Sequence, residues 1–102
     1  MQIDLLYFEG CASWKRALEN LRAALAAEGL QADVRLVKVE DAAEAARLKF
    51  LGSPSFQVGG MDLWRDERQD YAMSCRVYST PEGMRGIPST EMLRKQLHEG
   101  FK

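Results

Sequence analysis

The stretch that decides the fold is Leu5-Leu6-Tyr7-Phe8-Glu9-Gly10-Cys11-Ala12-Ser13-Trp14. The nearly continuous apolar run over residues 3–8 is typical of a strand that is covered on both faces. Gly10 then predicts a turn, and Ser13 has the chemistry of a helix cap. Cys11 is therefore expected at the mouth of a helix, where unpaired backbone N–H groups and the helix dipole favour a thiolate.

The residues after this stretch predict a helix followed by a second strand. Apolar residues recur at helical spacing over residues 13–28, and Gly29 suits the left-handed position that ends a helix. Residues 33–39 predict the strand, and Arg35 and Lys38 within it favour a place at the edge of a sheet. Two strands joined by a helix are expected to be parallel, with a right-handed crossover.

A second helix and a hairpin are expected next. Asp41 and Glu44 resemble a capping box, and the alanine-rich stretch to Leu51 predicts a short helix that ends at Gly52. The pair Gly59-Gly60 lies between two short apolar-alternating runs, which is a hairpin signal. A two-residue loop pairs Val58 with Met61 and Phe56 with Leu63.

The connection over residues 65–88 is long for a chain of this size, and such segments tend to be functional or mobile. Its charged part, residues 65–70, is interpreted as a solvated loop. Residues 73–78 return apolar side chains and Cys75 to the fold, and residues 81–83 predict a turn. A last helix is expected from Ser89, its N-cap, to Gly100.

Length and charge limit the domain organisation and the partners. The 102 residues predict a single domain over 1–102, of which 46% are hydrophobic. With 14 basic and 15 acidic residues the formal net charge is −1, so neither nucleic acid nor a membrane surface is an expected partner. Two cysteines without a dense cysteine framework, and the start of the chain directly in a strand, favour a cytoplasmic protein.

The order β-α-β-α-β-β-α, with a cysteine before the first helix and a proline heading the third strand, resembles the thioredoxin-like fold. The chain is most similar to small bacterial thioredoxin-like proteins, through residues 7–14, 51–55 and 74–78. This resemblance implies an α/β fold with a four-stranded mixed sheet and helices on both faces. It also implies that Pro54 follows a cis peptide bond and faces Cys11 across a groove.

The sequence differs from the redox motif of this fold at Trp14, which occupies the position of the second cysteine in Cys-x-x-Cys. A local disulfide cannot form. Cys11 can still act as a monothiol oxidoreductase, forming a mixed disulfide that an outside thiol resolves. The expected partners are protein or small-molecule thiols and disulfides. No cofactor is expected beyond glutathione as a co-substrate, and Cys11 is either this reactive thiol or a remnant in a fold without catalysis.

Cys75 is the second candidate catalytic residue, and its role stays open at this point. It is either a resolving partner of Cys11 or a buried structural cysteine. Arg76 is either an anion-binding side chain or an exposed arginine. The remaining candidates for substrate binding are Ser13, Trp14, Ser53 and Pro54, of which Trp14 also fits a core position and Pro54 a purely backbone role.

Two further classes of function compete with thiol–disulfide exchange. In the first, the chain is a non-catalytic module that binds a protein or peptide in the groove between Cys11, Pro54 and the long connection over residues 65–88. In the second, Cys11 and Cys75 supply two thiolates to a soft metal ion, Cu(I) or, through the same resemblance, Hg(II). A zinc or other metal centre with more ligands is not expected, because the chain has one histidine and two cysteines.

Overall fold

The computed structural model describes residues 2–64 and 71–100. Its main sheet has four strands in the order β2-β1-β3-β4. Their bounds are β1 (Gln2–Tyr7), β2 (Asp33–Lys38), β3 (Ser55–Val58) and β4 (Met61–Asp62). Strand β1 is parallel to β2 and antiparallel to β3, and β3 is antiparallel to β4. The chain is thus a mixed α/β protein with a mixed sheet, and β2 lies at the edge that its charges predicted.

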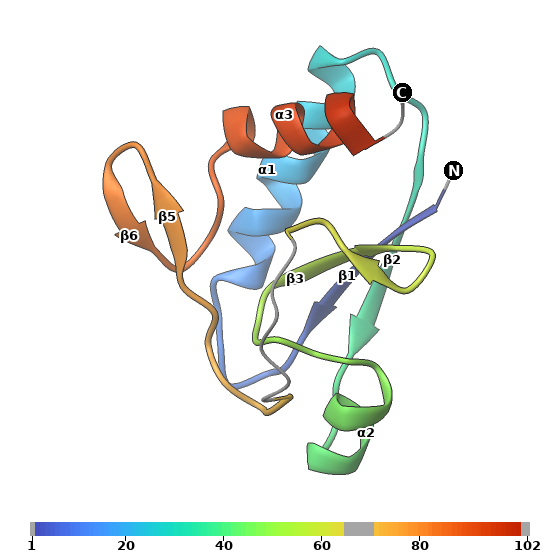
Figure 1. Cartoon of the computed structure of the whole chain (residues 1–102), viewed down its shortest axis with the longest axis vertical. Coiled ribbons are helices and arrows are strands. Elements are labelled where there is room, and N and C mark those ends of the chain that lie inside the picture. Colours follow the sequence, from blue (N-terminus) through green and yellow to red (C-terminus); the bar gives the residue numbers. More distant parts are fainter. Residues whose placement is uncertain (1, 65–70, 101–102) are drawn as a thin grey trace.

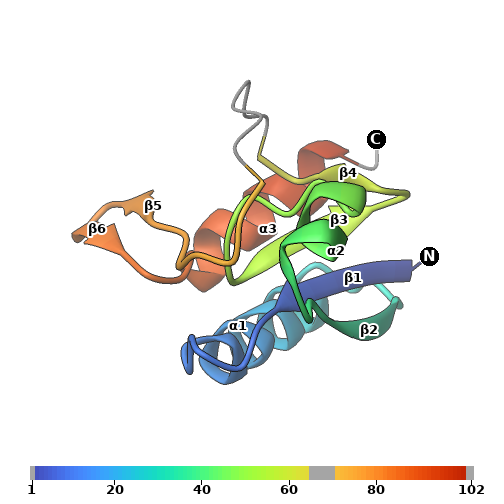
Figure 2. The same cartoon turned by 90° about the horizontal axis from the view of Figure 1, so that it is seen from below.

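Three helices cover the two faces of this sheet. They are α1 (Trp14–Ala27), α2 (Ala42–Arg47) and α3 (Thr90–Gly100). One core joins α1 and α3 to Leu5 and Phe56 of the sheet, whereas a smaller core joins α2 to Leu6 through Ala45 and Phe50. Figure 2 shows α1 and α2 on opposite sides of β1. Because Leu5 and Leu6 are adjacent in β1, they point to opposite faces of the sheet.

Most of the predicted helix ends are confirmed. Gly29 has a φ of 65° just after α1. Asp41 accepts a hydrogen bond from the backbone N–H of Glu44 at 2.8 Å, and Ser89 accepts one from the N–H of Met92 at 3.2 Å. Ser13 occupies the N-cap position of α1, but its side chain makes no capping hydrogen bond. Its hydroxyl is therefore available to another group.

The second helix is shorter than predicted. It ends at Arg47, and Lys49 takes the left-handed conformation with a φ of 55°. The N–H of Phe50 then bonds to the carbonyl of Ala45 at 2.9 Å, which turns the Phe50 ring into the smaller core. The prediction that Gly52 ends this helix is wrong, and the burial of Phe50 is the physical reason.

The hairpin at Gly59-Gly60 is confirmed in register. Val58 pairs with Met61, and the N–H of Leu63 bonds to the carbonyl of Phe56 at 2.9 Å. Phe56, Val58 and Leu63 contribute to the larger core. The side chain of Met61, in contrast, is exposed.

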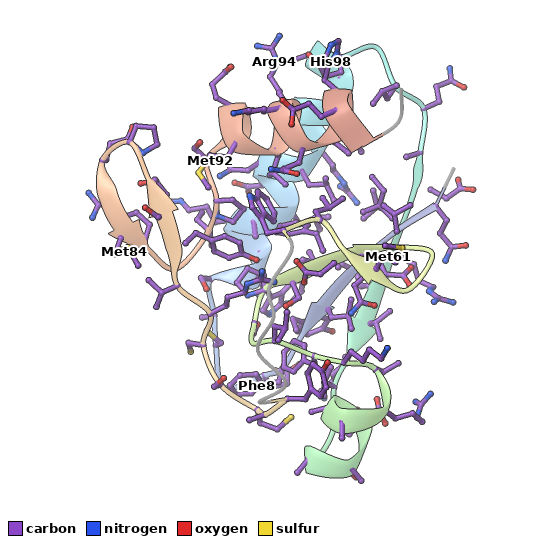
Figure 3. All side chains as sticks on the ribbon, in the orientation of Figure 1. Phe8, Met61, Met84, Met92, Arg94 and His98 are labelled. Carbon is purple, nitrogen blue, oxygen red and sulfur yellow. The ribbon has the colours of Figure 1, made fainter. Side chains whose placement is uncertain are left out.

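A second hairpin was not predicted. Strands β5 (Tyr78–Thr80) and β6 (Gly83–Arg85) form a separate two-stranded sheet around the predicted turn at residues 81–83. This hairpin extends away from the main sheet (Figure 1), and the exposed Met84 lies on its outer side (Figure 3). The predicted solvated loop at 65–70 lies outside the described residues. Among those described, no helix has the length and apolar character needed to cross a membrane.

Candidate functional site

Cys11 lies in the turn between β1 and α1 and faces the start of β3. Only 8% of the residue is exposed. Its Sγ is 3.6 Å from Ser13 Oγ, and its thiol donates to the carbonyl oxygen of Ser53 at 3.7 Å. The hydroxyl of Ser13, which makes no capping hydrogen bond in α1, therefore forms a hydrogen bond with the Cys11 sulfur. The turn after Phe8, closed by a 3.2 Å hydrogen bond from the N–H of Cys11 to the carbonyl of Phe8, holds the cysteine in this place.

The segment that carries Cys75 docks on the same residue, Ser53. Cys75 and Ser53 form an isolated parallel β-bridge. The N–H of Ser53 donates to the carbonyl of Ser74 at 2.8 Å, and the N–H of Arg76 donates to the carbonyl of Ser53 at 2.9 Å. Both backbone groups of Ser53 are thus already paired within the chain. Residues 74–76 therefore occupy the position at Ser53 where an extended segment would pair.

The structure brings the two cysteines together at Ser53. Cys75 is exposed, so the interpretation of it as a buried structural cysteine is wrong. The pKa of Cys75 is raised above its ordinary value of 9.0, first by a hydrogen bond with the thiol of Cys11, then by desolvation, and then by the negative charge of Cys11.

Gly52 makes the close approach of the Cys75 segment feasible. Its φ of 116° lies in a region that side chains rarely adopt. A Cβ at this position would meet the Cβ of Arg76 at 3.0 Å and its backbone nitrogen at 3.1 Å. The absence of a side chain at Gly52 therefore lets the strand carrying Cys75 reach Ser53.

Arg76 is neither exposed nor open to a ligand in the predicted way. Its side chain is 5% exposed, and its guanidinium donates to both carboxylate oxygens of Asp62, at 2.7 and 3.1 Å. It also donates to Ser55 Oγ at 3.2 Å. The assignment of Arg76 to substrate binding is thus corrected: Asp62 takes the contacts that an anionic ligand needs. Instead, this ion pair anchors the segment beside Cys75 to β4.

Ser53 and Pro54 shape the site from below its surface. Both residues are fully buried, and the Ser53–Pro54 peptide bond is cis. The carbonyl of Pro54 accepts a hydrogen bond from the hydroxyl of Tyr78. Within the described residues, Ser53 Oγ has no hydrogen-bond partner. Both residues were predicted to bind substrate, and the structure places their side chains below the protein surface.

Trp14 packs as a core residue, which is one of the two roles that the sequence left open for it. Its ring stacks on that of Tyr7 with centroids 4.2 Å apart and an angle of 24° between the planes. It also packs against the larger core. Stacking across the end of β1 and the start of α1 fixes the turn that contains Cys11.

Four residues of the site were missed from the sequence alone: Gly52, Ser55, Asp62 and Tyr78. For Gly52, the glycine before Ser53-Pro54 was a usable signal of a close backbone approach, but it was interpreted as the end of a helix. Asp62 and Tyr78 gave no comparable signal, because their partners Arg76 and Pro54 are distant in sequence.

The burial of Tyr78 predicts that the free energy of unfolding depends on pH in the alkaline range. Burial raises the pKa of Tyr78 far above its ordinary value of 10.0. Above pH 10 the unfolded chain therefore releases this proton while the folded chain keeps it, and the free energy of unfolding should fall by about 1.4 kcal/mol per pH unit from this group. Urea titrations from pH 8 to 11 should show a smaller loss for Tyr78→Phe. Equal losses in both proteins would contradict the burial of a protonated hydroxyl.

Comparisons with known proteins add no relative to this picture. No family model, curated protein or solved structure matches the chain. Among the described residues, no group of three or more His, Cys, Asp or Glu side chains is placed to hold a metal ion. The functional argument therefore depends on the pair of cysteines at Ser53.

Proposed function

We propose that the chain is a thioredoxin-like thiol–disulfide exchange protein whose redox couple is Cys11 and Cys75. The observation that carries this proposal is the meeting of both cysteines at Ser53: Cys11 through its 3.7 Å thiol contact, and Cys75 through its β-bridge. Trp14 occupies the position of the second cysteine in the local motif. We propose that Cys75, from a distant segment, supplies the second sulfur instead. The couple differs from the monothiol expected from the sequence.

The arrangement of elements supports the thioredoxin-like part of the proposal. The element order β1-α1-β2-α2-β3-β4, with α3 last, and a four-stranded mixed sheet agree with what the resemblance implies. Cys11 lies before α1, and Pro54 lies directly before β3. The β5–β6 hairpin is an addition to this pattern, and it follows directly on the segment that carries Cys75.

Exposure assigns different roles to the two sulfurs. Cys75 is exposed and Cys11 is 8% exposed, so an outside disulfide meets Cys75 first. Cys75, whose pKa is raised, gives its proton to water, and its sulfur attacks one sulfur of that disulfide, RSSR, so that a mixed disulfide forms and RS⁻ leaves. The Cys11 thiolate then attacks Cys75 Sγ, forms the Cys11–Cys75 disulfide and expels the second RS⁻. Two protein thiols lose two electrons and two protons, and RSSR gains them as two RSH.

The reverse reaction uses the same positions. An outside thiolate attacks Cys75 in the oxidised protein, and Cys11 leaves as a thiolate. A leaving sulfur departs faster when its thiolate is stabilised. The α1 N-terminus and the Ser13 hydroxyl, 3.6 Å from Cys11 Sγ, both favour a negative charge there.

Reaction stoichiometry tests this proposal. The fully reduced protein is mixed with an excess of bis(2-hydroxyethyl) disulfide, and free thiols are counted before and after removal of small molecules. We expect each chain to lose both of its thiols and to release two molecules of mercaptoethanol without a stable adduct. A chain that keeps both thiols, or that ends with one adduct on each cysteine, would refute the couple.

The neighbouring sulfurs also favour a second candidate, binding of a soft metal ion by two thiolates. Two sulfur ligands suit Cu(I) or Hg(II). Calorimetry with Cu(I) separates this from exchange, using the double variant Cys11→Ser/Cys75→Ser as the reference. Uptake of one ion per chain above that reference supports a metal site, and equal heats from the two proteins dismiss it.

A further inference from the structure

A hollow lies between the first turns of α1 and the β5–β6 hairpin. It has a volume of about 270 Å³, and its walls include Arg16, Glu82, Arg85 and Ile87. We call it the arginine cavity. Its volume is close to the lower limit of about 300 Å³ that is usual for small-molecule sites.

The arginine cavity adjoins the site through two residues. Gly86 follows Arg85 and packs beside the start of α1, where a Cβ built on it would lie 3.9 Å from Ser13 Oγ. That oxygen is 3.6 Å from Cys11 Sγ. Arg16 is three residues after Ser13 on the same helix, a rise of about 4.5 Å. Gly86 and Ser13 thus connect the hairpin and helix that form the cavity to the turn that contains Cys11.

The charges of the arginine cavity are available for a ligand. Within the described parts of the chain, Arg35, Arg76 and Arg94 form ion pairs, whereas Arg16 and Arg85 form none. Within the described residues, the Arg85 guanidinium donates a hydrogen bond to the backbone carbonyl of Met84, at 3.4 Å. Two guanidinium groups and one carboxylate, Glu82, thus line the hollow. Its other walls are polar at Asn20, Thr80 and Ser89 and apolar at Ile87 and Pro88.

We propose that the arginine cavity selects anionic low-molecular-weight thiols and disulfides as the substrates of Cys75. This inference depends on the proposed exchange function and names its substrate class. Carboxylates of the substrate bind Arg16 and Arg85, and an ammonium group binds Glu82. A tripeptide thiol with two carboxylates and one ammonium, as in glutathione, has these charges in the same number. An extended protein substrate is disfavoured, because residues 74–76 already occupy both backbone groups of Ser53.

A ratio of two rates tests the substrate class. The reduced protein is oxidised by glutathione disulfide, which is anionic, and by bis(2-hydroxyethyl) disulfide, which is neutral. Loss of charge-assisted hydrogen bonds in Arg16→Gln/Arg85→Gln should lower the ratio of the first rate to the second about tenfold or more. The matched control is Arg22→Gln/Arg47→Gln, which removes the same charge from exposed helical positions outside the cavity and should keep the wild-type ratio.

Each outcome decides between the two proposals. An unchanged ratio in Arg16→Gln/Arg85→Gln, or an equal fall in the control, overturns the arginine cavity as the selecting site. In that case, normal oxidation by the neutral disulfide leaves the exchange function standing. Wild-type protein that reacts with neither disulfide overturns the exchange function, and the substrate class with it.

Discussion

Cys11→Ser should stop the reaction at a mixed disulfide on Cys75. The first thiol of an outside disulfide is released, because Cys75 is exposed and unaltered. Release of the second thiol then needs another outside molecule. An oriented internal nucleophile can act at an effective concentration of about 10⁵ M, so its loss should slow this step by three orders of magnitude or more at millimolar thiol. Intact-mass spectrometry should show one adduct per chain, located on Cys75.

The matched variant Cys75→Ser tests the order of attack. Its remaining sulfur, Cys11, belongs to a residue that is 8% exposed, so we expect the first thiol to be released much more slowly than from wild type. A hydroxyl at either position preserves polarity and size, and both variants should fold. If Cys75→Ser forms an adduct on Cys11 at the wild-type rate, Cys11 is the entry point, and the assignment of roles is reversed.

Gly52→Ala should lower the free energy of unfolding by about 3 kcal/mol, since it combines an unfavourable backbone conformation with overpacking. The added methyl group would lie 3.0 to 3.2 Å from three atoms of Arg76, two of them backbone atoms that cannot rotate away. The segment must then move off Ser53, and Cys75 moves with it. We therefore also expect slower formation of the Cys11–Cys75 disulfide. Urea denaturation and thiol counting measure the two effects.

Gly59→Ala is the control for this prediction. Gly59 has a positive φ of 61°, but a Cβ there would meet no atom within 4 Å. Its substitution should cost only about 1 kcal/mol, the usual penalty of the left-handed conformation, and should leave disulfide formation unchanged. Equal losses of stability in the two variants would show that Gly52 is required only for its φ, and not for the approach of Arg76.

The sequence predicted most of the elements because their signals are local. The Gly59-Gly60 hairpin, the Asp41 cap and the edge position of β2 each follow from residues within a few positions of one another. The error at Gly52 shows the limit of such signals, since a glycine after an alanine-rich run fits a helix end equally well. Burial of Phe50 decided between the two interpretations, and burial depends on the whole sheet.

The candidate site was predicted only in part because its main contacts are long-range. Cys11 and its place before α1 followed from the strand-to-helix pattern. Cys75 pairs with Ser53, which is 22 positions away in the sequence, and no repeating pattern of residues predicts such a contact. Arg76 is a clear case: the sequence left open an anion-binding or an exposed arginine, whereas Asp62 of β4 holds it inside the fold.

The account can be tested most directly by equilibrating the protein in glutathione buffers of increasing oxidation, trapping free thiols and mapping tryptic peptides. Trypsin places Cys11 in residues 1–15 and Cys75 in residues 69–76. We predict that these two peptides become linked by a disulfide in a single two-electron transition. Separate glutathione adducts on the two peptides, with no linked species at any buffer ratio, would contradict the account.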